Sequence, residues 1–139
     1  MGDWIDSYLD AWNRHDSAAL VGFMTDEVVY TDQALGATHR GKADVKKFIE
    51  DFESQMSTDY KFEHVRSLTT DDGYFIEWVV SGTNDRGGDQ MPATGKRFNV
   101  RGVSVGDLSG GKIKRNVDYW SLAELLGQVG LMPTPAATS

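Results

Sequence analysis

Four polar or aromatic side chains near the end of the chain are spaced so that they could form one site. Asn116, Asp118 and Trp120 alternate along a predicted strand, 112–120, and share one of its faces, which Lys114 begins nearer the preceding turn. Asp118 has an apolar and an aromatic neighbour and precedes a leucine-rich segment, so an ordinary solvated position is not expected. Such an aspartate either caps the C-terminal turn or is a desolvated carboxylate whose raised pKa suits acid–base catalysis.

Other side chains present a similar choice between structure and chemistry. Asp32 follows a short apolar strand, where it either opens an Asx turn or adds a second carboxylate to a site. Tyr8 and Trp12 lie one helical turn apart and share a face, on which core packing is the favoured role of Trp12. Arg101 alternates with apolar neighbours, so it is either an exposed arginine or a partner of Glu77 across the sheet, or it stabilises a developing oxyanion.

Two glycine-rich motif matches are not expected to be catalytic. Residues 102–106 match G-x-S-x-G, but Ser104 lies inside an alternating strand and not at a strand-to-helix bend, so no nucleophile elbow is expected. Residues 106–112 nearly match a phosphate-binding loop, but Ile113 replaces the Mg²⁺-binding Ser or Thr. The histidines are isolated and cysteine is absent, so neither a metal site nor a thiol nucleophile is predicted.

The composition is typical of one small globular domain. The 139 residues are 40% hydrophobic and 25% charged, which excludes a disordered or fibrous chain. The net charge of −7 and the lack of a basic stripe argue against a nucleic-acid partner. No apolar stretch could span a membrane and the acidic N-terminus does not resemble a signal peptide, so we expect a cytoplasmic protein without a membrane partner.

The predicted elements place most helices before most strands. Helical spacing of apolar residues predicts helices that follow the caps Asp3 and Ser17, and a third helix over about 42–55. A last short helix follows Ser121, and residues 33–41 are predicted to be a loop. Strands are predicted over 28–31, 60–67, 74–83, 98–105 and 112–120. We expect a single α+β domain over residues 1–132, with helices on one face of a curved sheet, and a disordered tail over 133–139.

Several segments resemble the SnoaL-like polyketide (ester) cyclases of the nuclear transport factor two-like superfamily. In the N-terminal half these are YLDAWN at 8–13, TDE at 25–27 and THRGK at 38–42. In the C-terminal half they are PATGKR at 92–97, RGV at 101–103, GKI at 111–113, Asp118 and LLGQVG at 125–130. The resemblance implies a cone-shaped, strongly curved mixed sheet around three N-terminal helices, a deep apolar pocket and a homodimer formed through the sheet.

The resemblance also implies ring closure by an intramolecular aldol reaction, without metal or cofactor. Its acid–base aspartate lies on the last long strand, where Asp118 stands; the family's histidine on the preceding strand is unmatched, and Ser104 and Arg101 are the candidates there. The ligand would be a small apolar or aromatic, polyketide-like carbonyl compound. The candidate pocket aromatics are Trp12, Phe23, Phe48, Trp78 and Trp120, and the expected oxyanion donor is Arg101, Asn116 or His39.

Two other activities of the superfamily require residues that are only partly present. An epoxide-hydrolase-like Asp–Arg–Asp set is not expected, because Trp78 and Val80 stand where its second Asp and its Arg belong. A steroid-isomerase-like site would use Tyr8 and Asp32, but its protonated oxyanion acid falls near positions 102–103 and is absent. The leading expectation is therefore a cofactor-free cyclase or lyase. The alternatives are a steroid-isomerase-like or dehydratase activity, and a non-catalytic ligand-binding module of the same fold.

Overall fold

The computed structural model describes residues 4–88 and 91–132 of the chain, which contain six strands and four helices. The predicted disordered tail, 133–139, lies outside the described residues. In chain order the elements are α1 (Trp4–Asn13), α2 (Ser17–Val21), β1 (Met24–Asp32), β2 (Ala37–Arg40), α3 (Lys42–Gln55), β3 (Lys61–Thr69), β4 (Gly73–Thr83), β5 (Arg97–Ser109), β6 (Lys112–Trp120) and α4 (Leu122–Gln128).

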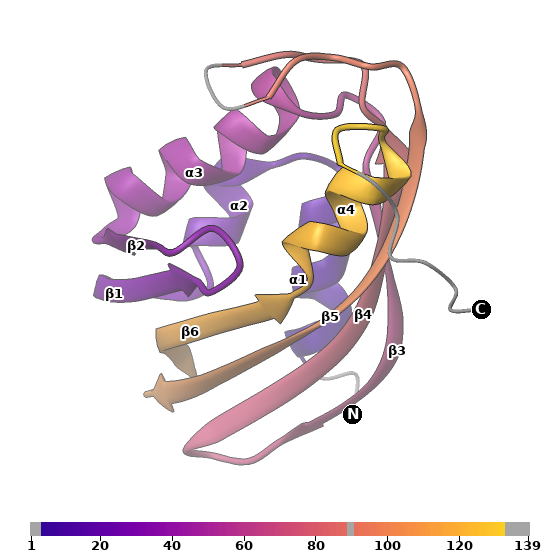
Figure 1. Ribbon diagram of the computed structural model, residues 1–139. Coiled ribbons are helices and arrows are strands. Elements are labelled where there is room, and N and C mark those ends of the chain that lie inside the picture. Colours follow the sequence, from indigo (N-terminus) through magenta and orange to yellow (C-terminus); the bar gives the residue numbers. More distant parts are fainter. Residues whose placement is uncertain (1–3, 89–90, 133–139) are drawn as a thin grey trace.

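The six strands form one mixed sheet that curves around the helices (Figure 1). Their order is β2-β1-β6-β5-β4-β3, and neighbouring strands are antiparallel except β1 and β6, which run parallel. The ends of two parallel neighbours lie at the same edge of a sheet. The parallel pairing therefore brings Asp32 at the end of β1 into direct register with Asp118 near the end of β6.

The inner face of the sheet is built by strict alternation along the central strands. In β4, buried and partly exposed residues alternate over the whole strand, and the buried ones include Tyr74, Ile76, Trp78 and Val80. Full burial of such side chains contributes about 1.5–3 kcal/mol each. This face packs against α1, whose buried side chains are Ile5, Tyr8, Leu9, Ala11 and Trp12.

Two of the four helices, α3 and α4, begin where the sequence predicts them. The predicted cap of α2, Ser17, is wrong, because Asp16 caps this helix by accepting a hydrogen bond from the backbone N–H of Ala19 at 3.0 Å. The predicted cap Asp3 lies outside the described residues. α3 spans Lys42–Gln55, which agrees with the predicted 42–55, and follows Gly41, whose φ of +86° favours glycine. α4 starts after Ser121, whose hydroxyl accepts a hydrogen bond from the backbone N–H of Glu124 at 3.1 Å. No helix in the described ranges is long and apolar enough to cross a bilayer.

Several predicted boundaries and one predicted face are wrong for local physical reasons. β1 begins at Met24 instead of 28, because Met24 already pairs with Ile113 of β6. β2 lies inside the predicted loop 33–41, because Gly36 (φ +65°) helps to reverse the chain so that it pairs with β1. β5 continues to Ser109 instead of ending at 105, because its pairing with β6 persists up to the glycine turn. A register shift in β6 adds a residue at Lys114, which is therefore exposed and does not share the face of Asn116.

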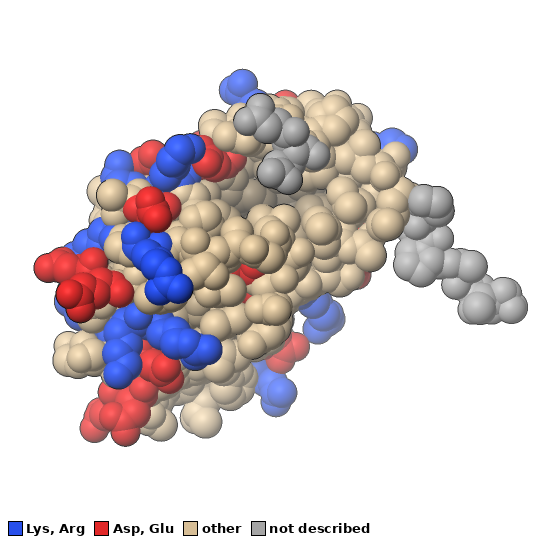
Figure 2. All heavy atoms as spheres, turned by 60° about the vertical axis from the view of Figure 1, so that its left-hand side comes forward, with Lys and Arg blue, Asp and Glu red and all other residues tan. Residues whose placement is uncertain are grey.

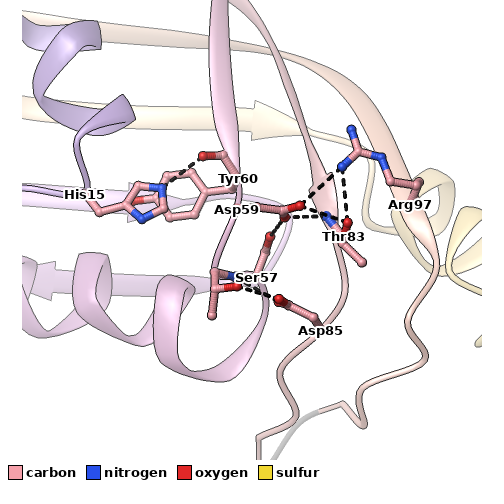
Figure 3. Close-up of polar contacts among 8 residues, drawn as sticks. His15, Ser57, Asp59, Tyr60, Thr83, Asp85 and Arg97 are labelled. Atoms are coloured by element: carbon pink, nitrogen blue, oxygen red, sulfur yellow. Dashed lines mark hydrogen bonds and ion pairs between the residues drawn. The ribbon is translucent and has the colours of Figure 1, made fainter.

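A group of polar side chains surrounds Asp59, near the ends of β3 and β4 that adjoin the segment 84–96 (Figure 3). Asp59 accepts hydrogen bonds from Ser57 Oγ at 2.9 Å, from Thr83 N and Oγ1 at 2.7 and 2.9 Å, and from Arg97 Nη1 at 3.4 Å. The backbone N–H of Thr83 contributes most to lowering the pKa of Asp59 below its ordinary value. We call these four residues the Asp59 cluster, which joins three stretches of chain.

Asn84 continues this connection into the core. Its side chain is fully buried, donates to the carbonyl oxygen of Met56 at 3.2 Å and accepts from the backbone N–H of Thr94 at 3.0 Å. These bonds satisfy a buried amide and fix both ends of the segment 84–96. Met91, which belongs to this segment, lines the cavity described below.

Candidate active site

A cavity of about 510 Å³ lies between the inner face of the sheet and the helices. Its size and its largely apolar lining, which is rich in aromatic rings, are typical of a small-molecule site. Figure 2 shows a hollow in a mainly uncharged part of the surface, with charged side chains gathered to one side. The lining aromatic residues are Tyr8, Trp12, Tyr30, Phe48, Phe52, Phe62, Trp78, Phe98 and Trp120.

Asp118 is buried in this cavity and is 7% exposed. Its Oδ1 accepts hydrogen bonds from Ser104 Oγ at 2.6 Å and Asn116 Nδ2 at 2.8 Å, and its Oδ2 accepts one from Tyr30 Oη at 2.5 Å. Burial raises the pKa of Asp118 to about 6, although the three hydrogen bonds act in the opposite direction. The carboxylate is thus held in one orientation but is a stronger base than a solvated aspartate.

Two aromatic side chains hold the partners of Asp118 in place. Trp78 Nε1 donates to Ser104 Oγ at 2.9 Å, and Tyr74 Oη donates to Asn116 Oδ1 at 2.5 Å. Each bond occupies an acceptor of the partner and leaves its O–H or N–H group for the carboxylate. The orientation of Asp118 therefore depends on side chains from β4 as well as β5 and β6.

The two glycines that flank Ser104 make room for these rings. A Cβ at Gly102 would lie 2.2 Å from the Trp78 ring, and a Cβ at Gly106 would lie 2.3 Å from the Tyr74 hydroxyl. Ser104 itself lies in the middle of β5, which confirms that no nucleophile elbow is present at this motif. The G-x-S-x-G match instead reflects close packing of two aromatic rings beneath the carboxylate.

Asp32 adds a second buried carboxyl to the cavity and is 4% exposed. Trp120 Nε1 donates to its two oxygens at 3.1 and 3.0 Å, and the backbone N–H of Leu35 donates to Oδ1 at 2.9 Å. The bond to Leu35 confirms the turn that one interpretation expected. Burial raises the pKa of Asp32, which the hydrogen bond from Trp120 opposes.

Two further polar atoms in the cavity wall have no hydrogen-bond partner among the described residues. Tyr8 Oη lies near Trp12 and Tyr30 but makes no hydrogen bond of ordinary geometry. His39 stacks on Phe48 with ring centroids 4.5 Å apart, and its Nε2 is buried and unpaired. Buried polar atoms are normally paired, so these two atoms are available to a ligand.

A family model described as a SnoaL-like domain matches residues 5–116. The chain belongs to the SnoaL-like family. The matched segment ends at Asn116, so Asp118 lies two residues beyond it. A search of curated proteins finds no match to the sequence of this SnoaL-like protein.

Solved structures resemble the SnoaL-like protein over nearly its whole length. A protein of Catenulispora acidiphila with a ketosteroid isomerase-like fold, in complex with trimethylamine, is 22% identical, with a TM-score of 0.82 and coverage of 100% of this chain and 98% of that chain. A candidate polyketide cyclase of Xanthomonas campestris is 24% identical, with a TM-score of 0.80 and coverage of 90% and 93%. A candidate SnoaL-like polyketide cyclase of Shewanella putrefaciens is 16% identical, with a TM-score of 0.76 and coverage of 92% and 94%. These likenesses confirm the predicted curved α+β fold.

Arg101 is not part of the cavity of the SnoaL-like protein. Its side chain is 71% exposed on the outer face of β5, and its Nη1 lies 3.8 Å from Glu77 Oε2. The prediction that it stabilises an oxyanion in the pocket is wrong, because the inner face at this point belongs to Gly102. The alternative interpretation, an exposed arginine paired with Glu77, is confirmed.

Two more predicted pocket residues lie behind the cavity wall. Phe23 packs against Tyr8 and Trp4, with ring centroids 5.4 and 6.5 Å away, and does not line the cavity. Asn116 also lies outside the lining, because it is enclosed between Tyr74 and Asp118. The structure places the other predicted residues in the lining, namely Tyr8, Trp12, Asp32, His39, Phe48, Trp78, Asp118 and Trp120.

Sequence reasoning missed Tyr30, which donates the shortest hydrogen bond to Asp118. A signal was present, because Tyr30 precedes Asp32 by two residues and so shares its face of β1. Within the described ranges, no group of three or more His, Asp or Glu side chains is arranged to hold a metal ion.

Proposed function

We propose that this SnoaL-like protein is an enzyme that removes a proton from the carbon next to a carbonyl group and closes a ring by an intramolecular aldol reaction. The observation that carries the proposal is the buried Asp118 carboxylate, which faces an aromatic cavity and has a pKa of about 6. At pH 7 such a group is mostly ionised, so it can accept a proton. General-base catalysis of this kind contributes about 10²–10⁴-fold.

Tyr8 is the proposed donor to the enolate oxygen. Its hydroxyl is buried in the cavity wall and has no partner among the described residues. Burial raises the pKa of Tyr8, so the hydroxyl stays protonated and can donate a hydrogen bond to developing negative charge. A preorganised donor of this type contributes about 10²–10³-fold. The base and the donor are both side chains, so the proposed chemistry needs no cofactor.

The charges in the cavity favour a neutral carbonyl substrate. Asp32 and Asp118 are both buried there, and Lys47 is the one Lys or Arg among the described residues that line the cavity. The side chain of Lys47 is 74% exposed and pairs with Asp51 at 2.9 Å, so it does not neutralise the interior. A ligand carboxylate would meet two buried negative groups, whereas an aromatic ketone or ester would pack on the rings.

The proposal is tested with Asp118→Asn and a matched control, Asp59→Asn. The probe is 2-tetralone, an aromatic ketone whose α-hydrogens exchange with D₂O, and exchange is followed by proton NMR. We expect Asp118→Asn to lower catalysed exchange at least about 10²-fold, and Asp59→Asn to leave it unchanged. Full exchange activity in Asp118→Asn, or no catalysed exchange by the unmodified protein, would contradict the proposal.

A second candidate is the binding of a small organic cation without chemistry. It is favoured by the combination of two buried carboxyls with many aromatic rings in one cavity, which is suited to cation–π contacts. The Catenulispora acidiphila structure is described as a complex with trimethylamine. Calorimetry with choline and its neutral isostere 3,3-dimethylbutan-1-ol separates the candidates. Tighter binding of choline supports the second candidate, and tighter binding of the neutral alcohol supports the first.

A further inference from the structure

Asp32 and His39 form a polar pair in the cavity wall that the proposed function does not use. Asp32 ends β1, and His39 lies on β2 directly opposite Tyr30. Because residues two apart on a strand share a face, the side chains of Asp32 and His39 lie on the same face of this strand pair. Both residues line the cavity, as does the exposed Leu35 of the turn between the two strands.

The contacts of Asp32 are those of a carboxylate ion. Trp120 Nε1 donates to Oδ2 at 3.0 Å and to Oδ1 at 3.1 Å, and the backbone N–H of Leu35 donates to Oδ1 at 2.9 Å. Both oxygens are thus acceptors, and the negative charge of Asp32 is one of the causes that raise the pKa of Asp118. A carboxylate has about four lone-pair sites, so Oδ2, which receives one N–H group, can accept a further hydrogen bond.

His39 supplies a second polar atom beside this carboxylate. Its ring stacks on Phe48 with centroids 4.5 Å apart, and its buried Nε2 has no partner among the described residues. The ring lies close enough to Asp32 for its charge to affect that carboxylate. Because buried polar atoms are normally paired, a ligand group bound here should donate to Asp32 and also form a hydrogen bond with His39.

A hydroxyl group meets both requirements. Its O–H donates to the carboxylate, and its oxygen accepts from an imidazole N–H. A carbonyl or ether oxygen can only accept, so it would leave Asp32 without a donor, and a ligand carboxylate would be repelled. Phe48 stacks on His39 and the Trp120 indole contacts Asp32, so the surroundings favour a hydroxyl group that is carried by an aromatic ring.

We propose that Asp32 and His39 are specificity-determining residues that bind a hydroxyl group on an aromatic ring of the substrate, which narrows the substrate class to phenolic ketones and esters. The inference rests on the proposed function, in which Asp118 removes the proton. Asp32 and Asp118 are direct partners on parallel strands about 4.8 Å apart. The substrate hydroxyl therefore lies about one aromatic ring away from the carbon that loses its proton.

The inference is tested with three compounds that differ in one substituent, namely 2-tetralone, 7-hydroxy-2-tetralone and 7-methoxy-2-tetralone, together with the 6-substituted pair. Calorimetry gives Kd for each compound, and proton NMR in D₂O gives its exchange rate. We expect one hydroxy isomer to bind at least about tenfold more tightly than both 2-tetralone and its own methoxy ether, because only the hydroxyl can donate to a carboxylate.

Asp32→Asn removes the charged acceptor and keeps an oxygen for the N–H of Leu35, so the local turn is retained. An amide is a weaker acceptor than a carboxylate, and its N–H group can also donate to a methoxy oxygen. We expect the preference for the hydroxyl compound to fall below about threefold in this variant. Asp59→Asn makes the same substitution outside the cavity lining and should keep the full preference.

His39→Phe gives an independent test that does not alter Asp32. The phenyl ring can keep the stacking on Phe48, but it lacks the ring nitrogen that bonds the hydroxyl. We expect this variant to bind the hydroxyl compound at least about threefold more weakly, without a comparable change in the binding of 2-tetralone.

Binding and exchange together separate this inference from the proposed function. Exchange that depends on Asp118, with no preference for either hydroxy isomer, overturns the inference and leaves the proposed function standing. A hydroxyl preference that survives in both Asp32→Asn and His39→Phe also overturns it. A hydroxyl preference that is lost in these variants, without catalysed exchange of any tetralone, supports the hydroxyl site and contradicts the proposed function. Failure of every tetralone to bind contradicts both.

Discussion

Asp118 and Asp59 each accept hydrogen bonds from three residues, yet their pKa values move in opposite directions. In the cavity, Asp118 is bound by Ser104, Tyr30 and Asn116, and its pKa rises to about 6. In the Asp59 cluster, the donors are Ser57, Thr83 and Arg97, and the pKa falls.

The difference lies chiefly in exposure to solvent, because the hydrogen bond from the Thr83 backbone N–H dominates at Asp59, whereas burial dominates at Asp118. The Asp59 side chain is 49% exposed and lies 3.4 Å from the guanidinium of Arg97, so its charge is solvated and partly balanced. Asp118 is 7% exposed, and its three donors are neutral. The number of hydrogen bonds therefore does not decide the basicity of a carboxylate, because desolvation outweighs them in the cavity. The Asp59 carboxylate joins three stretches of chain, whereas the Asp118 carboxylate keeps the basicity that proton removal requires.

The comparison predicts opposite effects of pH on stability. The folded protein binds a proton at Asp118 (pKa about 6) more tightly than the unfolded chain does (3.8), so wild-type stability falls as the pH rises through this interval. Asp118→Asn removes this fall in stability with pH, because asparagine does not ionise. We expect its stability relative to wild type to increase by about 2 kcal/mol between pH 4 and pH 7, measured by urea unfolding. A relative stability that is the same at both pH values would contradict the raised pKa.

Catalysis should follow the ionisation of Asp118. Proton removal requires the carboxylate, so the exchange rate of 2-tetralone should rise through a pKa of about 6 and level off above it. The rate at pH 4 should be about 10²-fold below the plateau. Asp59→Asn should give the same profile, because the Asp59 cluster is not part of the cavity lining. A rate independent of pH between 4 and 8 would remove Asp118 from the role of base.

Tyr30→Phe sharpens the comparison by removing one donor without opening a large space. The hydroxyl of Tyr30 stabilises the ionised form of Asp118, so its loss should raise the pKa of Asp118 by about one unit. The acidic limb of the rate profile should move to higher pH by the same amount. A limb that stays in place would show that this hydrogen bond does not tune the base.

The smallest effect on stability is expected in the Asp59 cluster. Asp59→Asn keeps one acceptor for Thr83 but loses the charge that pairs with Arg97, and we expect about 1 kcal/mol lower stability at pH 7. Because the pKa of Asp59 is lowered in the folded state, this loss should shrink as the pH falls below about 4. Chemical unfolding at pH 7 and pH 3 measures both values. A larger loss of stability at pH 3 than at pH 7 would contradict the stabilising role of the ionised Asp59 carboxylate.

Alternation and capping made most of the fold predictable. β4 and α3 follow period-two and helical patterns over their full lengths, and Ser121 caps α4 as expected. β2 was missed because its four residues carry no apolar alternation, and it is a strand only through its pairing with β1. Lys114 was misplaced because a bulge changes which residues face inward without leaving a pattern in sequence.

The candidate site was predictable only in part. The position of Asp118 between apolar neighbours indicated burial, and Asp32 was placed at a strand end. The partners of Asp118 could not be read from local spacing, because Tyr30 is 88 residues away and reaches it through the parallel pairing of β1 with β6. Arg101 was misassigned because alternation does not say which face of β5 is the inner one. The sheet register answers that question by placing Gly102 opposite Trp78.

The pKa of the Asp118 carboxyl tests the central claim most directly. It can be measured by carbon-13 NMR titration of the aspartate carboxyl signals, with Asp118→Asn identifying the resonance. The account predicts a value of about 6, above the ordinary 3.8, together with a signal for Asp59 that titrates below its ordinary value. A value for Asp118 at or below about 4 would make it a hydrogen-bonded structural group and would contradict its role as the base.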